Sequence, residues 1–154
     1  MLSALRTDSL NKDFVHLVTL LDADLANRDG EENIFYAQFN GIASLKHCIV
    51  RYENNIAVGC GALKSFDHNS MEIKRMYVLE GYRRKGIASG LLSELEKWAK
   101  ELGYKTCVLE TGLRQPEAIA LYKKNNYVPI SNYPPYEQIA NSVCFSKLLP
   151  PAYS

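Results

Sequence analysis

The stretch from residue 72 to residue 98 constrains the fold of this chain most. It starts with a strand-like segment, Glu72–Val78, and continues through a short basic segment. It ends in a segment whose apolar residues recur every three or four positions, at Ile87, Leu91, Leu95 and Trp98, and Leu102 continues this spacing beyond the stretch. That spacing predicts an amphipathic helix with one face on a core, and Gly103 is placed to end it. A strand, a tight loop and an amphipathic helix in succession indicate a helix packed on a sheet.

The strand-like segment is irregular. Ile73 is apolar, but so are Met76 and Val78, which would point to the opposite face of a regular strand. The change of parity near Lys74–Arg75 predicts a β-bulge, a device common beside active sites. The alternative is a strand buried on both faces, with its two basic residues reaching water.

The loop before the helix is suited to an anion. Arg83, Arg84 and Lys85 supply positive charge, and Gly86 lets the backbone approach a ligand closely. Unpaired N–H groups at the helix start point to the same place, and the helix dipole favours negative charge there. Without a ligand, the same residues would be a basic helix start and nothing more.

Arg83-x-x-Gly86-x-Ala88 at the start of such a helix resembles the acetyl-CoA motif of the GNAT superfamily of N-acetyltransferases. The resemblance covers roughly Cys48 to Leu148, and the first third of the chain agrees only in the order of its elements. It implies an α/β (mixed α+β) fold, in which a mixed, mostly antiparallel sheet of about seven strands is flanked by about four helices. It also implies a splayed parallel strand pair that holds acetyl-CoA, with CoA as the product.

By this resemblance, backbone N–H groups of the loop bind the pyrophosphate of the cofactor. The Met76 N–H would meet the acetyl carbonyl, and Val78 would pair with the pantetheine amides. Gln115 departs from the Asn that is usual in the family. The implied cofactor-binding residues are Met76, Tyr77, Val78, Arg83, Arg84, Lys85, Gly86, Ile87, Ala88, Ser89, Gln115 and Tyr122.

Acyl transfer to an amine needs a group that takes a proton from the amine and a group that protonates the departing thiolate. Glu72, four residues before Met76, matches the catalytic glutamate of the histone-acetylating branch and is the first candidate for the base. Glu110, at the end of a later strand, is the second candidate. Tyr122, in a segment that resembles the family's Asn…Ala…Leu-Tyr…Gly-Phe pattern, is the candidate acid. The alternative for Glu72 is an exposed glutamate in an ion pair. The alternative for Tyr122 is a tyrosine that only fills the core.

Three residues are candidates for the acceptor site. Glu31 lies in an acidic link between two expected helices, a segment that often borders the acceptor in the family. Tyr133 and Tyr136 lie in a loop rich in aromatic residues and proline. These two rings line the acceptor site, cover it, or form a dimer contact.

The remaining elements follow from periodicity and turn residues. We expect an edge strand at 2–6 and a helix from about residue 10 that Thr7, Asp8 or Ser9 caps. We also expect helices at 31–39 and from Pro116 to about Asn125. Further strands are expected at 47–52, 56–66, 105–111, 127–130 and 141–148. The long helix that begins at Ile87 connects the strands at 72–78 and 105–111 by a right-handed crossover, which predicts that these two strands are parallel neighbours.

Composition excludes several classes of protein. The chain of 154 residues suits a single domain, 1–154, and its net charge of +1 gives no electrostatic case for nucleic acid as a partner. Its four cysteines and three histidines lack the spacing of a metal site. Buried free thiols, with no signal peptide or membrane span, indicate a cytoplasmic protein.

The sequence therefore predicts an acetyl-CoA-dependent N-acetyltransferase that acts on a primary amine of a small molecule or peptide by direct attack in a ternary complex. Two alternatives remain: a protein N-acetyltransferase acting on lysine or an N-terminus, and a non-catalytic acyl-CoA sensor. A sensor would keep Arg83, Gly86 and Ala88 but have no use for Glu72 or Tyr122. The protein is expected to be a monomer or a homodimer.

Overall fold

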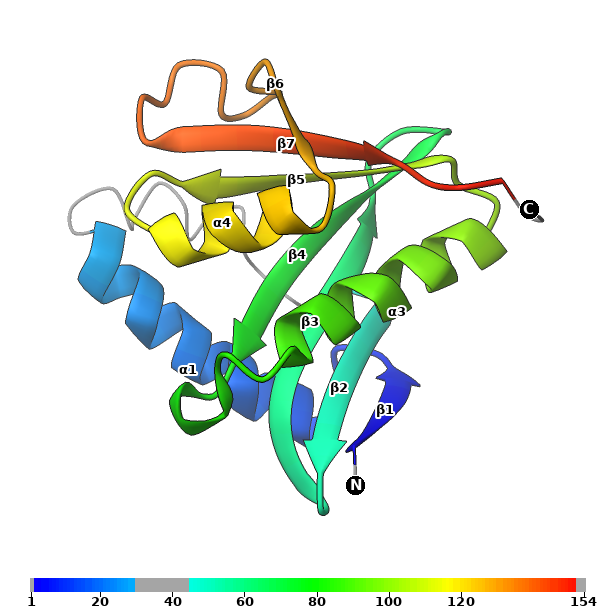
Figure 1. Cartoon of the computed structure of the whole chain (residues 1–154), viewed down its shortest axis with the longest axis vertical. Helices are drawn as coiled ribbons and strands as arrows, with labels where there is room; N and C mark the ends of the chain where they lie inside the picture. The colour runs from blue at the N-terminus through cyan, green and yellow to red at the C-terminus, as the bar shows by residue number, and fades with distance from the viewer. Residues whose placement is uncertain (1, 30–44, 152–154) are drawn as a thin grey trace. The chain divides into compact units, whose positions relative to one another are not determined.

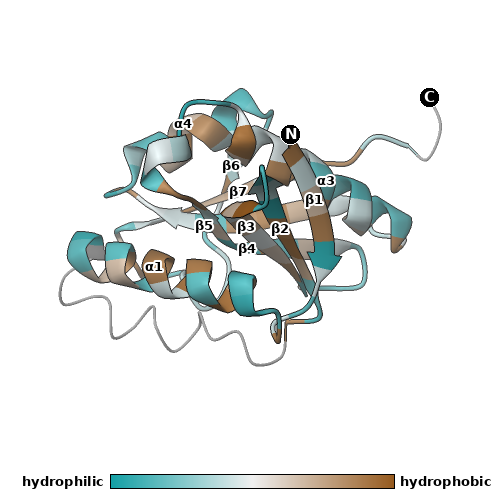
Figure 2. Cartoon of the chain, turned by 90° about the horizontal axis from the view of Figure 1, so that it is seen from below, coloured by the Kyte–Doolittle hydropathy of each residue, from teal (hydrophilic) through white to brown (hydrophobic). Residues whose placement is uncertain are grey.

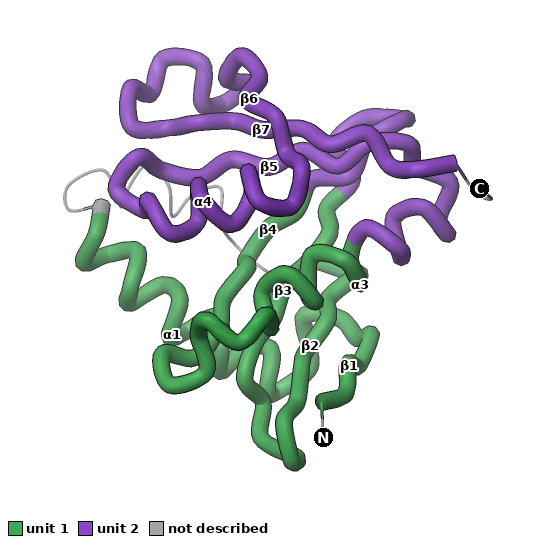
Figure 3. Tube along the Cα trace, viewed as in Figure 1, with its two compact units in different colours: residues 1–64, 73–95 green, residues 65–72, 96–154 purple. Residues whose placement is uncertain are grey.

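The computed structural model describes residues 2–29 and 45–151, which form two compact units. Figure 3 shows unit 1, residues 1–64 and 73–95, in green and unit 2, residues 65–72 and 96–154, in purple. The elements in chain order (Figure 1) are β1 (Leu2–Thr7), α1 (Lys12–Asp29), β2 (His47–Glu53), β3 (Ile56–Ser65), β4 (Ser70–Val78), η2 (Glu80–Tyr82), α3 (Ile87–Glu101), β5 (Thr106–Gly112), α4 (Pro116–Lys124), β6 (Val128–Ile130) and β7 (Ser142–Leu148). The helix expected at 31–39 lies outside the described residues.

The strands form a seven-stranded sheet in the order β1-β2-β3-β4-β5-β7-β6. The pairs β1/β2, β2/β3, β5/β7 and β6/β7 are antiparallel, whereas β4 and β5 are parallel. The parallel ladder joins Ser70–Glu72 to Thr106–Val108, while β4 continues to Val78 and β5 to Gly112. The predicted mixed, mostly antiparallel sheet of about seven strands is confirmed, and the short parallel ladder is compatible with the predicted splay.

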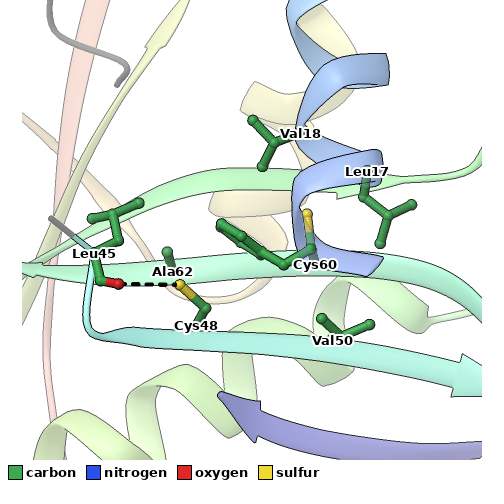
Figure 4. Packing of buried hydrophobic residues seen from close by; sticks show 8 residues of the cluster. Leu17, Val18, Leu45, Cys48, Val50, Cys60 and Ala62 are labelled. Atoms are coloured by element: carbon green, nitrogen blue, oxygen red, sulfur yellow. Dashed lines mark hydrogen bonds between the residues drawn. The ribbon is translucent and has the colours of Figure 1, made fainter. Parts of the chain in front are cut away.

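In unit 1, α1 packs on one face of β2 and β3. The apolar side chains of α1 and of the two strands form a buried cluster (Figure 4) that consists of Phe14, Leu17, Val18, Leu45, Cys48, Val50, Cys60 and Ala62. Hydrophobic and hydrophilic residues alternate along α1, as Figure 2 shows, and this pattern gives the helix one face for the core.

The other face of β3 receives α3. A Cβ added at Gly61 would lie 2.8 Å from Leu95 Cδ1, and one added at Gly59 would lie 3.0 Å from Leu91 Cδ1. The small residues of β3 therefore serve both faces: Cys60 and Ala62 admit α1, and the two glycines admit α3. Because the helix sits directly on the strand, the amino end of α3 has a fixed position in unit 1.

In unit 2, an ion pair ties the carboxyl half of α3 to the last strand. Glu96 accepts a hydrogen bond from the Tyr127 hydroxyl at 2.9 Å and from Lys147 Nζ at 2.8 Å. The side chains of Glu96 and Lys147 are 13% and 20% exposed, so removing one partner would leave the other charge poorly solvated. The pair explains how a charged residue is tolerated beside the buried face of α3.

The ends of the elements show two departures from the sequence-based expectations. The side chain that caps α1 is Asn11, whose Oδ1 accepts the Phe14 N–H at 3.0 Å, and not Thr7, Asp8 or Ser9. Asp8 instead accepts the Leu10 N–H and shapes the preceding turn. Leu102, expected on the buried stripe, is 42% exposed because α3 ends at Glu101.

Three asparagines and a glycine turn the chain as expected. Asn54 and Asn55 have φ of 50° and 69° in the turn between β2 and β3, Asn126 has φ of 73° after α4, and Gly103 has φ of 96° after α3. Within the described residues, no helix is both long and apolar enough to cross a membrane.

Candidate active site

The loop before α3 is built from left-handed residues in unit 1. After β4 ends at Val78, η2 leads into a loop in which Arg84 has φ of 65° and Gly86 has φ of 80°. A Cβ added at Gly86 would meet no atom within 4 Å. The backbone at this glycine therefore faces open space and is accessible to a ligand.

The first turn of α3 offers N–H donors to the same loop. The Gly90 N–H donates to the Gly86 carbonyl at 3.0 Å, and the N–H groups before it have no helical carbonyl to bond. The turn contains no acidic residue, and Arg84 and Lys85 are exposed. These donors and charges fit a ligand that carries phosphate groups.

Arg83 braces the loop. Its Nε donates to the Val78 carbonyl at 2.9 Å, and its guanidinium lies 5.5 Å from the centroid of the Tyr77 ring. The first residue of the motif therefore ties the loop to the end of β4, a role that its charge alone does not reveal. Tyr77 and Val78, assigned to the cofactor by resemblance, take part in this brace through the ring and the carbonyl.

Arg51 is a further cation near the helix start, and sequence reasoning missed it. A Cβ added at Gly90 would lie 2.7 Å from Arg51 Nη1, so the guanidinium packs against the first turn of α3. Its buried Nε has no hydrogen-bond partner in the part of the chain that the structure describes. The available signal was Gly90 itself, because a glycine inside a helix costs about 0.5–1 kcal/mol relative to alanine unless it makes room for something.

The irregularity of β4 is centred on Arg75. This residue has φ of 59°, a left-handed conformation that is uncommon for a side chain of this size, and it accounts for the change of parity that predicted a bulge. Arg75 is buried, and its guanidinium pairs with Asp22 on α1. The alternative in which both basic residues reach water is therefore wrong for Arg75. Its carbonyl also accepts a hydrogen bond from the Cys60 thiol.

Glu72 is buried in unit 2 and holds a hydrogen bond. The Tyr133 hydroxyl donates to Glu72 Oε2 at 2.8 Å, and each residue is 8% exposed. The alternative of an exposed glutamate on the strand is wrong, because Glu72 is enclosed. Tyr133, which the sequence suggested for the acceptor site, donates its hydroxyl to the candidate base.

Glu110 and Cys144 are opposite each other in the β5/β7 register. Burial raises the pKa of Cys144 to about 11, and the negative charges of Glu110 and Glu72 act in the same direction. The two candidate carboxylates therefore influence the same thiol from neighbouring strands. Glu110 is half-buried.

Tyr122 lies on α4 and is buried among aromatic rings of unit 2. Its ring centroid is 5.9 Å from that of Tyr127 and 6.2 Å from that of Phe145. Burial raises the pKa of the Tyr122 phenol, and the charge of Glu110 adds to the rise. The phenol is therefore protonated at neutral pH, which is the state that a proton donor requires.

Gln115 and Tyr136 are the other predicted residues of unit 2. Gln115 precedes α4 and its side chain makes no capping hydrogen bond; its Nε2 lies 3.5 Å from the position of a Cβ on Gly112. Tyr136 is 2% exposed and stacks edge-to-face on Tyr133 at 5.8 Å. Because both rings are buried within the unit, they are not exposed contacts for a second subunit. Glu31 lies outside the described residues.

The cysteines offer no nucleophile. All four, Cys48, Cys60, Cys107 and Cys144, are free and buried. Burial raises the pKa of each thiol, to about 12 for Cys60 and Cys107, so that the neutral form prevails at physiological pH. Among the described residues, no group of three or more His, Cys, Asp or Glu side chains is placed to hold a metal ion.

A mixed sheet whose central strand leads through a basic, glycine-bearing loop into an amphipathic helix has the architecture of an acetyl-CoA-dependent acetyltransferase. The model of the acetyltransferase (GNAT) family matches residues 14–127, more than half of the 154 residues. The chain therefore belongs to the GNAT family, and the resemblance inferred from the motif at Arg83–Ala88 is confirmed. The enzyme class and acetyl-CoA as cosubstrate, both predicted from the sequence, agree with this membership.

Two relatives illustrate the similarity. Probable N-acetyltransferase 14 of Xenopus tropicalis is 36% identical over 90 residues, which is 58% of this chain and 44% of the relative. The uncharacterized N-acetyltransferase YsnE of Bacillus subtilis is 33% identical over 100 residues, 64% of this chain and 66% of the relative. The matches thus span about half to two thirds of these relatives.

Solved structures share the fold over nearly the whole chain. A Klebsiella pneumoniae protein described as an acyl-CoA N-acyltransferase has a TM-score of 0.81 at 27% identity and covers 97% of this chain and 98% of its own. A GNAT acetyltransferase of Elizabethkingia anophelis, solved with acetyl-CoA bound, has a TM-score of 0.69 at 19% identity, covering 96% and 98%. At that identity, the second likeness concerns the fold alone.

Proposed function

We propose that this protein transfers the acetyl group of acetyl-CoA to a primary amine of a small molecule or peptide, by direct attack in a ternary complex. The observation that carries the proposal is the loop at the start of α3, where a left-handed glycine faces open space and exposed cations lie beside the first turn of the helix. We propose that residues 1–154 act as a single domain, because β4 and α3 each run from one unit into the other.

The loop and the end of β4 hold the cosubstrate. Backbone N–H groups of the loop and of the first turn of α3 would donate to the pyrophosphate, and Arg84 and Lys85 add charge. The Met76 N–H polarises the acetyl carbonyl, since a donor aimed at a developing oxyanion stabilises the transition state. When bound, acetyl-CoA supplies the acetyl group as an activated thioester.

Glu72 acts as the general base and Tyr122 as the general acid. Glu72 is buried, hydrogen-bonded and on the same strand as Met76, so its carboxylate has a fixed position from which to accept the ammonium proton. The Tyr122 phenol is neutral because burial raises its pKa, and it donates a hydrogen bond or a proton to the leaving sulfur. Glu110 is the second choice for the base.

Direct attack is favoured over an acyl-enzyme route by the state of the cysteines. An acyl-enzyme would need a nucleophile such as a thiolate. Each of the four thiols is buried with a raised pKa, which is about 11 for Cys144, the residue opposite Glu110 in the β5/β7 register. This state of the thiols supports the proposal that the amine of the acceptor attacks the thioester itself.

The test is a screen of amines and peptides with acetyl-CoA, in which thiol release is measured as a function of pH. The wild type should show kcat/KM rising with pH through one ionisation of the free enzyme. Glu72→Gln should lower kcat and abolish that limb, whereas Glu110→Gln should retain it. If Glu110→Gln loses the limb and Glu72→Gln retains it, the base is Glu110. No thiol release with any acceptor, despite binding of acetyl-CoA, would favour a sensor.

A further inference from the structure

A short, buried hydrogen bond connects the hydroxyl of Tyr133 to the carboxylate of Glu72. The phenol donates to Oε2 at 2.8 Å, and each residue is more than nine-tenths buried. The two residues are 61 positions apart in the sequence. A buried hydrogen bond to a carboxylate restricts the rotamer of the acid and favours its charged form.

The ring of Tyr133 is held from two sides. The rings of Phe66 and Tyr136 pack edge-on against it, with centroid distances of 4.7 Å and 5.8 Å. The loop that carries the ring is fastened by Asn132, whose Nδ2 donates to the carbonyls of Ser142 at 2.9 Å and Tyr136 at 3.2 Å. The phenol therefore reaches the carboxylate from a fixed position.

The titratable groups around this pair come from three elements. Burial raises the pKa of the Tyr133 phenol, and the charges of Glu72, Cys144 on β7 and Tyr136 in the loop add to the rise. Glu110 on β5 acts on Cys144. Near neutral pH the phenol and the thiol are protonated, so Tyr133 is available as a donor to Glu72 throughout the range in which an acetyltransferase would work.

We propose that Tyr133 is a positioning residue for the general base: its hydroxyl fixes the carboxylate of Glu72 and stabilises the charged form that accepts the ammonium proton. This inference rests on the proposed function and assigns Tyr133 to the base in place of the acceptor. The acidic limb of the pH profile therefore depends on a residue in the loop between β6 and β7.

Tyr133→Phe tests this role, because it removes one hydroxyl and retains the ring. Loss of the hydrogen bond should move the midpoint of the acidic limb of kcat/KM to higher pH by about one unit. kcat/KM below that midpoint should fall about tenfold, while KM for acetyl-CoA is unchanged. Tyr127→Phe, which removes a buried phenol that donates to a different carboxylate of the same unit, Glu96, is the matched control and should leave the midpoint in place.

A second variant avoids any loss of packing. With 3-fluorotyrosine in place of Tyr133, a more acidic phenol donates a stronger hydrogen bond, and the limb should move to lower pH. An unchanged midpoint in both variants of Tyr133 would overturn the inference. If Glu72→Gln retains the acidic limb of kcat/KM, the assignment of Glu72 as the base is wrong as well. If Glu72→Gln abolishes that limb while both variants of Tyr133 leave its midpoint unchanged, only the role of Tyr133 is wrong.

Discussion

Replacing Gly61 by alanine tests the close packing of α3 on β3. A Cβ at this position would lie 2.7 Å from Met76 Sδ and 2.8 Å from Leu95 Cδ1. Ordinary van der Waals contact begins near 3.4 Å, so both neighbours must move. Met76 is flexible and can adapt, but Leu95 is fully buried in the core and has little room to shift.

Two effects of opposite sign determine the magnitude. Alanine restricts the unfolded chain more than glycine does, which stabilises the fold by about 0.4–1 kcal/mol. Overpacking of a filled core costs about 1–3 kcal/mol. The steric effect is larger, and we expect a net loss of about 1–2 kcal/mol in the free energy of unfolding, or about 3–6 °C in Tm for a chain of this size.

Urea denaturation followed by circular dichroism measures this loss. Gly81→Ala is the control, because a Cβ at Gly81 would meet no atom within 4 Å and only the unfolded-state effect remains. Gly61→Ala should unfold at lower urea and Gly81→Ala at equal or slightly higher urea. If Gly61→Ala is as stable as the wild type, α3 does not pack on β3 as closely as described.

Two further predictions concern the catalytic residues and the thiols. Tyr122→Phe should lower kcat about ten- to a thousandfold while leaving the affinity for acetyl-CoA unchanged; wild-type turnover in thiol-release assays would make Tyr122 a core residue only. Burial raises the pKa of Cys144 to about 11 and that of Cys60 to about 12, from the ordinary thiol pKa of 9.0. The neutral thiols therefore contribute stability in full below pH 9.0, and this contribution is lost as the pH rises towards the pKa values of the folded protein. The free energy of unfolding should therefore fall between about pH 9 and pH 12. Folded protein should not react with a thiol reagent at pH 8; rapid labelling of the folded state would contradict the burial.

Local patterns in the sequence predicted the elements that local physics determines. The apolar spacing from Ile87 onwards identified α3 because a helix repeats every 3.6 residues. Asn54 and Asn55 identified a turn because asparagine tolerates positive φ. The motif from Arg83 to Ala88 identified the loop, since its glycine and helix start are neighbours in the chain.

The sequence did not predict contacts between distant residues. Arg75 pairs with Asp22, 53 positions away, and Glu72 bonds to Tyr133, 61 positions away. No spacing rule connects such residues, because their proximity arises only when the strands pair and the helices pack. The parity change in β4 did locate Arg75 as an irregular position, but not its burial.

The cap of α1 was missed for a different reason. Four residues near its start, Thr7, Asp8, Ser9 and Asn11, all have side chains that cap helices. The choice among them depends on where α1 meets the core, and the structure selects Asn11 because Phe14 must be buried. The helix therefore begins at Lys12, slightly beyond the start at about residue 10 that local capping preference predicted.

Calorimetric titration of acetyl-CoA tests the central claim most directly. Gly86→Glu places bulk and negative charge in the loop before α3, and Gly103→Glu makes the same change at the far end of the helix. Both glycines have positive φ, 80° and 96°, and open space around the Cβ, so the strain of the two variants is matched. We predict that the wild type and Gly103→Glu bind acetyl-CoA with equal affinity, and that Gly86→Glu does not bind it. Equal binding by Gly86→Glu would show that this loop is not the cosubstrate site.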